Sequence, residues 1–135
     1  MRPLGPTVVT PTSSSPERPP LVLVINDMIF ETKIRSTAQA IGLNTIVVRS
    51  AGDIERTIAE HRPRVVLVDL NTAGDAVRAV ELAKRHPSAP TVVAYGAHVD
   101  TALAEQAAAA GADPVLPRSR FSAELPRLLA AWCGP

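Results

Sequence analysis

The sequence predicts an α/β domain in which five parallel strands alternate with five helices. Short apolar runs rich in Val, Ile and Leu, typical of strands buried on both faces, are separated by segments with a helical spacing of apolar residues. Gly, Pro, Asn and Ser residues lie between the two kinds of segment. This alternation implies right-handed crossovers, and for five strands we expect a doubly wound parallel sheet of strand order 2-1-3-4-5.

The strands are expected at the five apolar runs, at residues 21–25, 45–48, 65–68, 91–95 and 113–116. The helices are expected after them, at residues 30–41, 50–62, 75–85, 99–110 and 122–132. Ser50 and Ser122 suit the N-caps of the second and fifth helices, and Asp53 is favourable in a first turn. Gly42 suits the position after the first helix, and Pro63 ends the second, because the residue before a proline avoids the α region.

The composition fits one domain, at residues 21–135, with a core of Val, Ile, Leu and Ala, because aromatic residues make up only 3% of the chain. Residues 1–20 hold six of the thirteen prolines and are expected to form a disordered arm.

The net charge of +1 comes without a Lys/Arg run or an aromatic platform, so no nucleic-acid partner is expected. No apolar run reaches the length of a membrane span, and one cysteine without an export signal indicates the cytoplasm.

Polar residues follow two strands that the expected order brings together. Asp69 follows the third strand, and Asn26 and Asp27 follow the first. In a parallel α/β sheet, binding sites lie beyond the carboxyl ends of the strands, where the strand order reverses. That point lies between the first and third strands here, so we expect these three side chains to lie side by side. The alternative is that Asp69 only ends its strand or caps the next helix.

Three segments resemble the receiver domain of bacterial response regulators, the CheY-like fold, and the resemblance covers residues 21–132. They are Leu-Val-Leu-Val-Ile-Asn-Asp ending at Asp27, Val-Val-Leu-Val-Asp-Leu-Asn ending at Asn71, and Gly-Ala-Asp-Pro-Val-Leu-Pro-Arg ending at Arg118. The resemblance implies a flavodoxin-like fold and a phospho-acceptor at Asp69. It also implies a Mg²⁺ site made by Asp27, Asp69 and the backbone carbonyl of Asn71, and it puts Arg118 at the position of the family's lysine.

The chain departs from the family's pattern at the site itself. Asn26 replaces an acid, and Tyr95 or Gly96 falls where the family has a Thr or Ser hydroxyl. The loss of one carboxylate should weaken Mg²⁺ binding about tenfold or more, because Mg²⁺ usually takes its charge from carboxylate oxygens. Tyr95 is too large for the short movement of a Thr or Ser hydroxyl, so we expect the family's switch to be absent or rewired.

Two further side chains belong to the predicted site. The planar guanidinium of Arg118 can hold a carboxylate in a bidentate pair, so we expect it to pair with Asp69 or Asp27 and to fill the metal's place. His98 follows the fourth strand at the same edge of the sheet. It is either a general base or ligand contact near the site, or a loop residue beside a helix start.

The resemblance implies a non-enzymatic role in bacterial signal transduction of the phosphorelay type. We expect a stand-alone, atypical receiver-like domain that binds a signalling protein or a histidine kinase, independently of phosphorylation or with weak phosphorylation. The face formed by residues Val99 to Trp132 is the expected contact surface, also for a homodimer. Two alternatives stay open: a competent Mg²⁺-dependent phospho-acceptor at Asp69, and a flavodoxin-like domain that binds a small ligand at the same edge.

Overall fold

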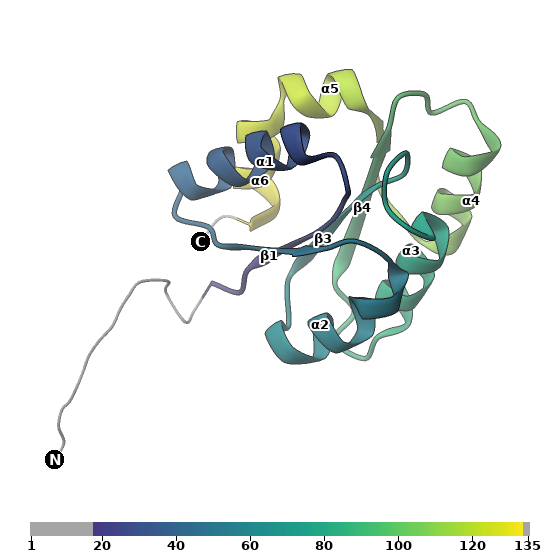
Figure 1. The fold of residues 1–135 in the computed structure, drawn as a ribbon, viewed down its shortest axis with the longest axis horizontal. Coiled ribbons are helices and arrows are strands. Elements are labelled where there is room, and N and C mark those ends of the chain that lie inside the picture. Colours follow the sequence, from purple (N-terminus) through teal and green to yellow (C-terminus); the bar gives the residue numbers. More distant parts are fainter. Residues whose placement is uncertain (1–17, 134–135) are drawn as a thin grey trace, which may run out of the picture.

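Five strands form one sheet in the computed structural model, which describes residues 18–133 (Figure 1). The strands are β1 Leu21–Val24, β2 Thr45–Val48, β3 Val65–Asp69, β4 Thr91–Gly96 and β5 Val115–Pro117. Each neighbouring pair is parallel, and the order β2-β1-β3-β4-β5 confirms the predicted sheet. Most of the expected N-terminal arm, residues 1–17, lies outside the described residues.

The helices are α1 Met28–Ala40, α2 Ile54–His61, α3 Ala76–Arg85, α4 Ala102–Ala110, α5 Arg118–Ala123 and α6 Leu125–Cys133, with a 3₁₀ turn, η2, at Ala51–Asp53. The prediction of five helices is wrong, because two helices, α5 and α6, follow β5 instead of one. Pro126 gives the physical reason: it has no N–H to donate to the carbonyl of Ser122, and its ring crowds that carbonyl. Ser122 therefore lies inside α5 and is not an N-cap. No helix within residues 18–133 has the length and hydropathy needed to cross a bilayer.

The starts of α4 and of the second helical segment differ from the prediction by three or more residues or in their caps. α4 begins at Ala102 and not at Val99, because the Thr101 hydroxyl caps it by accepting a hydrogen bond from the Ala104 N–H at 3.1 Å. The second helical segment begins with η2, and the side chain of Ser50 makes no capping hydrogen bond there.

β5 also begins later than predicted, at Val115 and not at Asp113. Pro114 explains the difference, because a proline has no N–H to contribute to a strand ladder. The strand then runs to Pro117, so Arg118 stands directly beyond its carboxyl end and opens α5. This register places Arg118 at the same edge of the sheet as the ends of β1 and β3.

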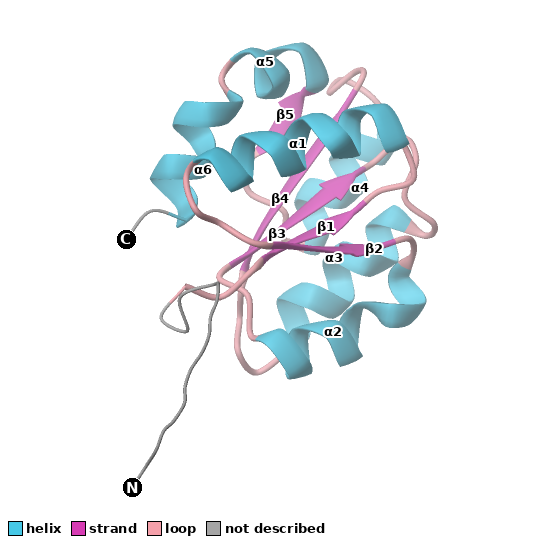
Figure 2. Ribbon diagram, turned by 60° about the vertical axis from the view of Figure 1, so that its left-hand side comes forward, coloured by secondary structure: helices cyan, strands magenta, loops and turns pink. Residues whose placement is uncertain are grey.

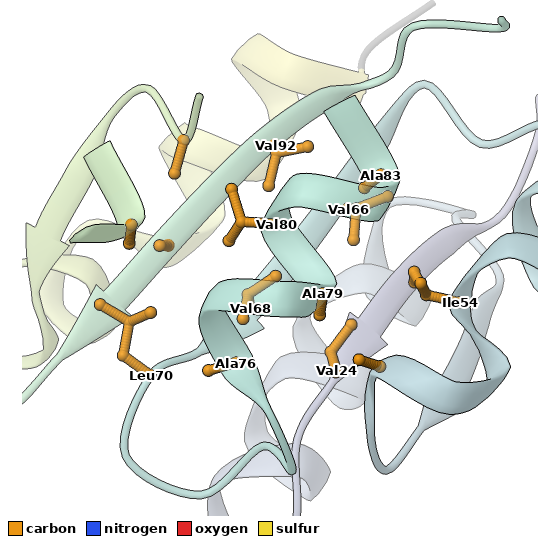
Figure 3. Close-up of a cluster of buried hydrophobic side chains, with 14 of the residues drawn as sticks. Val24, Ile54, Val66, Val68, Leu70, Ala76, Ala79, Val80, Ala83 and Val92 are labelled. Atoms are coloured by element: carbon orange, nitrogen blue, oxygen red, sulfur yellow. The ribbon is translucent and has the colours of Figure 1, made fainter. Parts of the chain in front are cut away.

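Side chains of the central strands alternate between two helical layers, as the pleat of a strand requires. One face packs against α2, α3 and α4 and includes Val22, Val24, Val66 and Val68 (Figure 3). The other face packs against α1, α5 and α6 and includes Leu21, Leu23, Ile25 and Leu67 (Figure 2). Burying each such side chain stabilises the fold by about 1.5–3 kcal/mol, so both layers hold the strand ends in place.

All four aromatic residues of the chain belong to one cluster on the second face, which the predicted core of aliphatic residues left out. The rings of Tyr95 and Phe121 stack with their centroids 4.4 Å apart, and Phe30 meets them edge-on at 5.4 and 6.0 Å. Trp132 stacks on Phe121 at 6.3 Å. The cluster therefore joins the end of β4 to α1, α5 and α6.

Candidate functional site

Asp69 is the last residue of β3 and lies at the point where the strand order reverses. Its side chain is buried, with the residue 3% exposed. The carboxylate oxygen Oδ1 accepts hydrogen bonds from the backbone N–H groups of Asn71 at 2.9 Å and Thr72 at 3.2 Å. These two bonds satisfy a buried charge that would otherwise be costly, and they turn the carboxylate back toward its own loop.

Asp27 stands at the neighbouring strand end and uses both of its carboxylate oxygens. Oδ1 caps α1 by accepting from the Phe30 N–H at 3.1 Å, and Oδ2 accepts from the Arg118 guanidinium at 2.9 Å. The centre of the guanidinium also lies 4.5 Å from the centroid of the Phe30 ring. The predicted pairing of Arg118 is thus found with Asp27. Because both partners are partly exposed, the pair contributes about 0.2–1 kcal/mol, and the ring contact adds a similar amount.

Asn26 acts as a donor, which the sequence reasoning missed. Its Nδ2 donates to the carbonyl of Arg49 at 3.0 Å and to the carbonyl of Thr72 at 2.8 Å, and its backbone N–H donates to the Thr72 hydroxyl at 3.0 Å. In the structure it ties the end of β2 to the loop after β3, which a carboxylate, having no N–H, cannot do.

Asn71 holds the loop on the other side of the site. Its side-chain Oδ1 accepts from the Ala97 N–H at 2.6 Å, and so connects the β3–α3 loop to the β4–α4 loop. Gly96 permits this approach, because a Cβ there would lie only 3.2 Å from the same oxygen. The two asparagines together fix the loops on both sides of Asp69.

Tyr95, and not Gly96, is the residue of β4 opposite Asp69. Its ring is buried, and its phenol lies among the charged groups of the site. Burial raises the pKa of the Tyr95 phenol well above its ordinary range, the charge of Asp69 raises it further, Arg118 lowers it, and Asp27 raises it. The phenol therefore stays protonated. The charges of Asp27, Asp69 and Arg118 all act on its pKa, so Tyr95 lies close to each of them.

A second ion-pair network lies beside the site and was not predicted. Glu31, in the first turn of α1, is a buried acid with 7% of its surface exposed. Its carboxylate accepts from the guanidinium groups of Arg49 at 2.6 Å and Arg35 at 3.4 Å, and Arg49 also donates to the carbonyl of Ile25 at 3.1 Å. The spacing of Glu31 and Arg35, four residues apart on a helix, was the one available signal.

His98 lies in the exposed loop after β4, at the predicted edge. Its side chain makes no hydrogen bond or ion pair with any residue between 18 and 133. The site therefore brings together Asp27, Asp69, Tyr95 and Arg118, while His98 makes no contact with them.

The acidic groups do not converge as a metal site would require. Across residues 18–133, no three His, Cys, Asp or Glu side chains form a cluster that could hold a metal ion. Asp27 is paired with Arg118, and the Oδ1 of Asp69 is saturated by two N–H groups. In this arrangement the side chains do not fit the oxygen-rich octahedral site that Mg²⁺ prefers.

The fold and this group of residues define a flavodoxin-like α/β domain with a charged cluster at its switch point. Solved receiver domains have the same fold. The receiver domain of sensor histidine kinase PA1611 from Pseudomonas aeruginosa PAO1, with Mg²⁺ in its active-site cleft, is 21% identical at a TM-score of 0.74, over 87% of this chain and 99% of that chain. The phosphorylated cyanobacterial phytochrome response regulator RcpA is 15% identical at a TM-score of 0.72, over 85% and 94%.

A third similar structure is the receiver domain of Francisella response regulator 1452, which is 16% identical at a TM-score of 0.70, over 84% of this chain and 95% of that chain. No protein-family model and no curated protein sequence matches this chain. The chain is therefore a receiver-like domain by its fold.

Proposed function

We propose that this chain is an atypical receiver domain that takes part in two-component signalling through protein contacts, without phosphorylation of Asp69. The ion pair between Arg118 and Asp27 carries this proposal. It puts a fixed positive charge against the carboxylate that the resemblance assigns to Mg²⁺, and so supports a site that is neutralised by the protein itself.

The surroundings of Asp69 support the same proposal. A phosphoryl donor must reach a carboxylate oxygen from solvent, and Asp69 is 3% exposed. One of its oxygens already accepts two backbone N–H groups. Both features oppose attack by this carboxylate on a phosphoryl group.

The proposed role is non-enzymatic, and its partner is a signalling protein or a histidine kinase. The face from Val99 to Trp132, which holds α4, β5, α5 and α6, stays the predicted contact surface, also for a homodimer. Val99 is one of three large apolar side chains that are exposed in residues 18–133.

Treatment with acetyl phosphate and millimolar MgCl₂, followed by intact-mass spectrometry, tests the proposal. We expect the full chain to gain no phosphoryl mass, and Mg²⁺ to give no saturable amide shift at Asp27 or Asp69 below the millimolar range. A variant Asn26→Asp/Arg118→Lys, which restores the family's charges, should bind Mg²⁺ about tenfold more tightly or better.

The second candidate function, a competent phospho-acceptor, is favoured by the place of Asp69 at the end of β3. Two of the structurally similar receivers carry Mg²⁺ or a phosphoryl group. A phosphoryl mass gain in the natural chain that disappears in Asp69→Asn would establish this candidate and overturn the first.

A further inference from the structure

Basic side chains gather at the amino edge of the sheet, opposite the candidate site. The strands and helices run in opposite directions, so the C-terminal ends of α2 and α3 lie at the same edge as the starting ends of β3 and β4, which follow them in the chain (Figure 2). The charged residues at this edge are Arg18, Arg62, Arg64, Lys84 and Arg85, with the acids Glu60 and Asp113. Five cations against two acids leave +3 at an edge of a chain whose formal charge is +1.

Three of these cations lack an acidic partner. Arg62, Lys84 and Arg85 are exposed and make no ion pair with any residue in the described range. The arginines elsewhere in that range are paired with acids, and they are Arg35, Arg49, Arg56, Arg78, Arg118, Arg120 and Arg127. The helix dipole favours Lys84 and Arg85 at the end of α3, but it leaves their donors free for a partner.

The segments that carry these cations adjoin one another at this edge. The alkyl chain of Lys84 lies against Gly111, where a Cβ would come within 2.7 Å of it, so the end of α3 adjoins the α4–β5 turn. Arg64 accepts a backbone hydrogen bond from Thr91 at 2.9 Å, and it lines one recess together with Arg18. Arg18 itself donates hydrogen bonds to the carbonyls of Ile41 and Cys133, at the C-terminal ends of α1 and α6.

The chemistry of the edge favours one class of partner. No aromatic side chain lies among these cations, and Trp132 stacks on Phe121 on the other face of the sheet, so bases of a nucleic acid would find no stacking platform. The helix C-termini between the cations carry partial negative charge that opposes any anion, so a partner must place its charges on the cations themselves, as the separate carboxylates of a flexible acidic segment can. The chain's own first 17 residues hold one acid, Glu17, and one base, Arg2. Their side-chain charges cancel, so this segment does not offer the negative charge that the basic edge would attract.

We propose that this amino edge is a docking surface for an acidic segment of a partner protein, with Arg62, Lys84 and Arg85 facing its carboxylates. This surface lies at the edge of the sheet opposite the candidate site, and it adjoins the Val99–Trp132 face at Gly111. It therefore holds whether or not Asp69 accepts a phosphoryl group.

Titration of the ¹⁵N-labelled full chain with an octaglutamate peptide at low salt tests the proposal. We expect saturable amide shifts confined to residues 60–64 and 84–91, which shrink as salt is raised. The variant Arg62→Gln/Arg85→Gln should bind the peptide about fivefold more weakly or worse. The matched control, Arg56→Gln/Arg78→Gln, removes two ion-paired charges from the same two helices and should change the affinity less than about twofold.

Three results would overturn the proposal. They are an absence of saturable shifts, an equal loss of affinity in both variants, and tighter binding of duplex DNA or of anionic phospholipid vesicles than of the peptide at the same salt. An unchanged thermal midpoint in the two variants ensures that the comparison reports binding and not folding.

Discussion

At the scale of single residues, Asn26 shows why an amide stands where the resemblance leads one to expect an acid. Its two N–H groups bridge the carbonyls of Arg49 and Thr72 across the switch point. We expect Asn26→Asp to lower the free energy of unfolding by about 1–2 kcal/mol at pH 7, because a carboxylate can donate neither bond and would face two carbonyl oxygens. Urea unfolding measures this change.

The control for Asn26 is Asn44→Asp, an exposed asparagine at the opposite edge, which should change stability by less than about 0.5 kcal/mol. Equal stability of Asn26→Asp and the natural chain would contradict the bridging role.

Tyr95 makes a pH-dependent contribution to stability. Burial and the charge of Asp69 raise the pKa of the folded phenol above its unfolded value of about 10. The unfolded chain therefore loses this proton first, and the stability that is present below pH 10 falls as the pH rises beyond it, by about 1.4 kcal/mol per pH unit. Tyr95→Phe should remove this part of the decline between pH 10 and 11.5, as measured by urea midpoints in both proteins. If the urea midpoints of Tyr95→Phe and of the natural chain fell in parallel between pH 10 and 11.5, this role of Tyr95 would be contradicted.

The sequence was sufficient to predict that Asp27 and Asp69 lie near one another, because strand order determines which strand ends meet. The resemblance to receiver domains placed Arg118 beside them. The sequence was not sufficient to choose Asp27 over Asp69 as the partner of Arg118, since both lie within reach of a long side chain. The hydrogen bonds that Asn26 donates and the burial of Glu31 depend on the conformation of the loops. The spacing of apolar residues along the chain does not predict loop conformation.

At the scale of elements, α5 contributes one buried side chain to the core. Phe121 is fully buried and stacks between Tyr95 and Trp132. We expect Phe121→Ala to lower the free energy of unfolding by about 3–5 kcal/mol, because it leaves a cavity at the centre of the aromatic cluster. The matched change Val99→Ala, at a 41% exposed position, should cost less than about 0.5 kcal/mol. A loss below about 1.5 kcal/mol for Phe121→Ala would show that α5 is held by other contacts.

Strands were predicted more closely than helix ends. A buried strand reveals itself through a run of apolar residues, and β3 appears one residue longer than its prediction only because Asp69 continues the ladder. Helix ends depend on single hydrogen bonds, such as the cap of Thr101 and the missing N–H of Pro126, which compete with a spacing that would otherwise continue.

At the scale of the whole molecule, the sheet separates two kinds of charge. The carboxyl edge holds the paired and buried acids of the candidate site. The amino edge holds Arg62, Lys84 and Arg85, which form no ion pair within residues 18–133. The sequence shows no long basic run, because these cations come from the end of α3 and from the α2–β3 connection, which the parallel fold brings to one edge. The topology was predictable, but the surface that it creates was not.

The chain has a single tryptophan, and that ring ends the stack that begins at the tyrosine beside Asp69. The indole is consequently a built-in optical probe. Displacement of the Arg118 guanidinium from Asp27 should change the fluorescence of Trp132, because the guanidinium lies over Phe30 and Phe30 packs against Phe121. No added label is needed for this measurement.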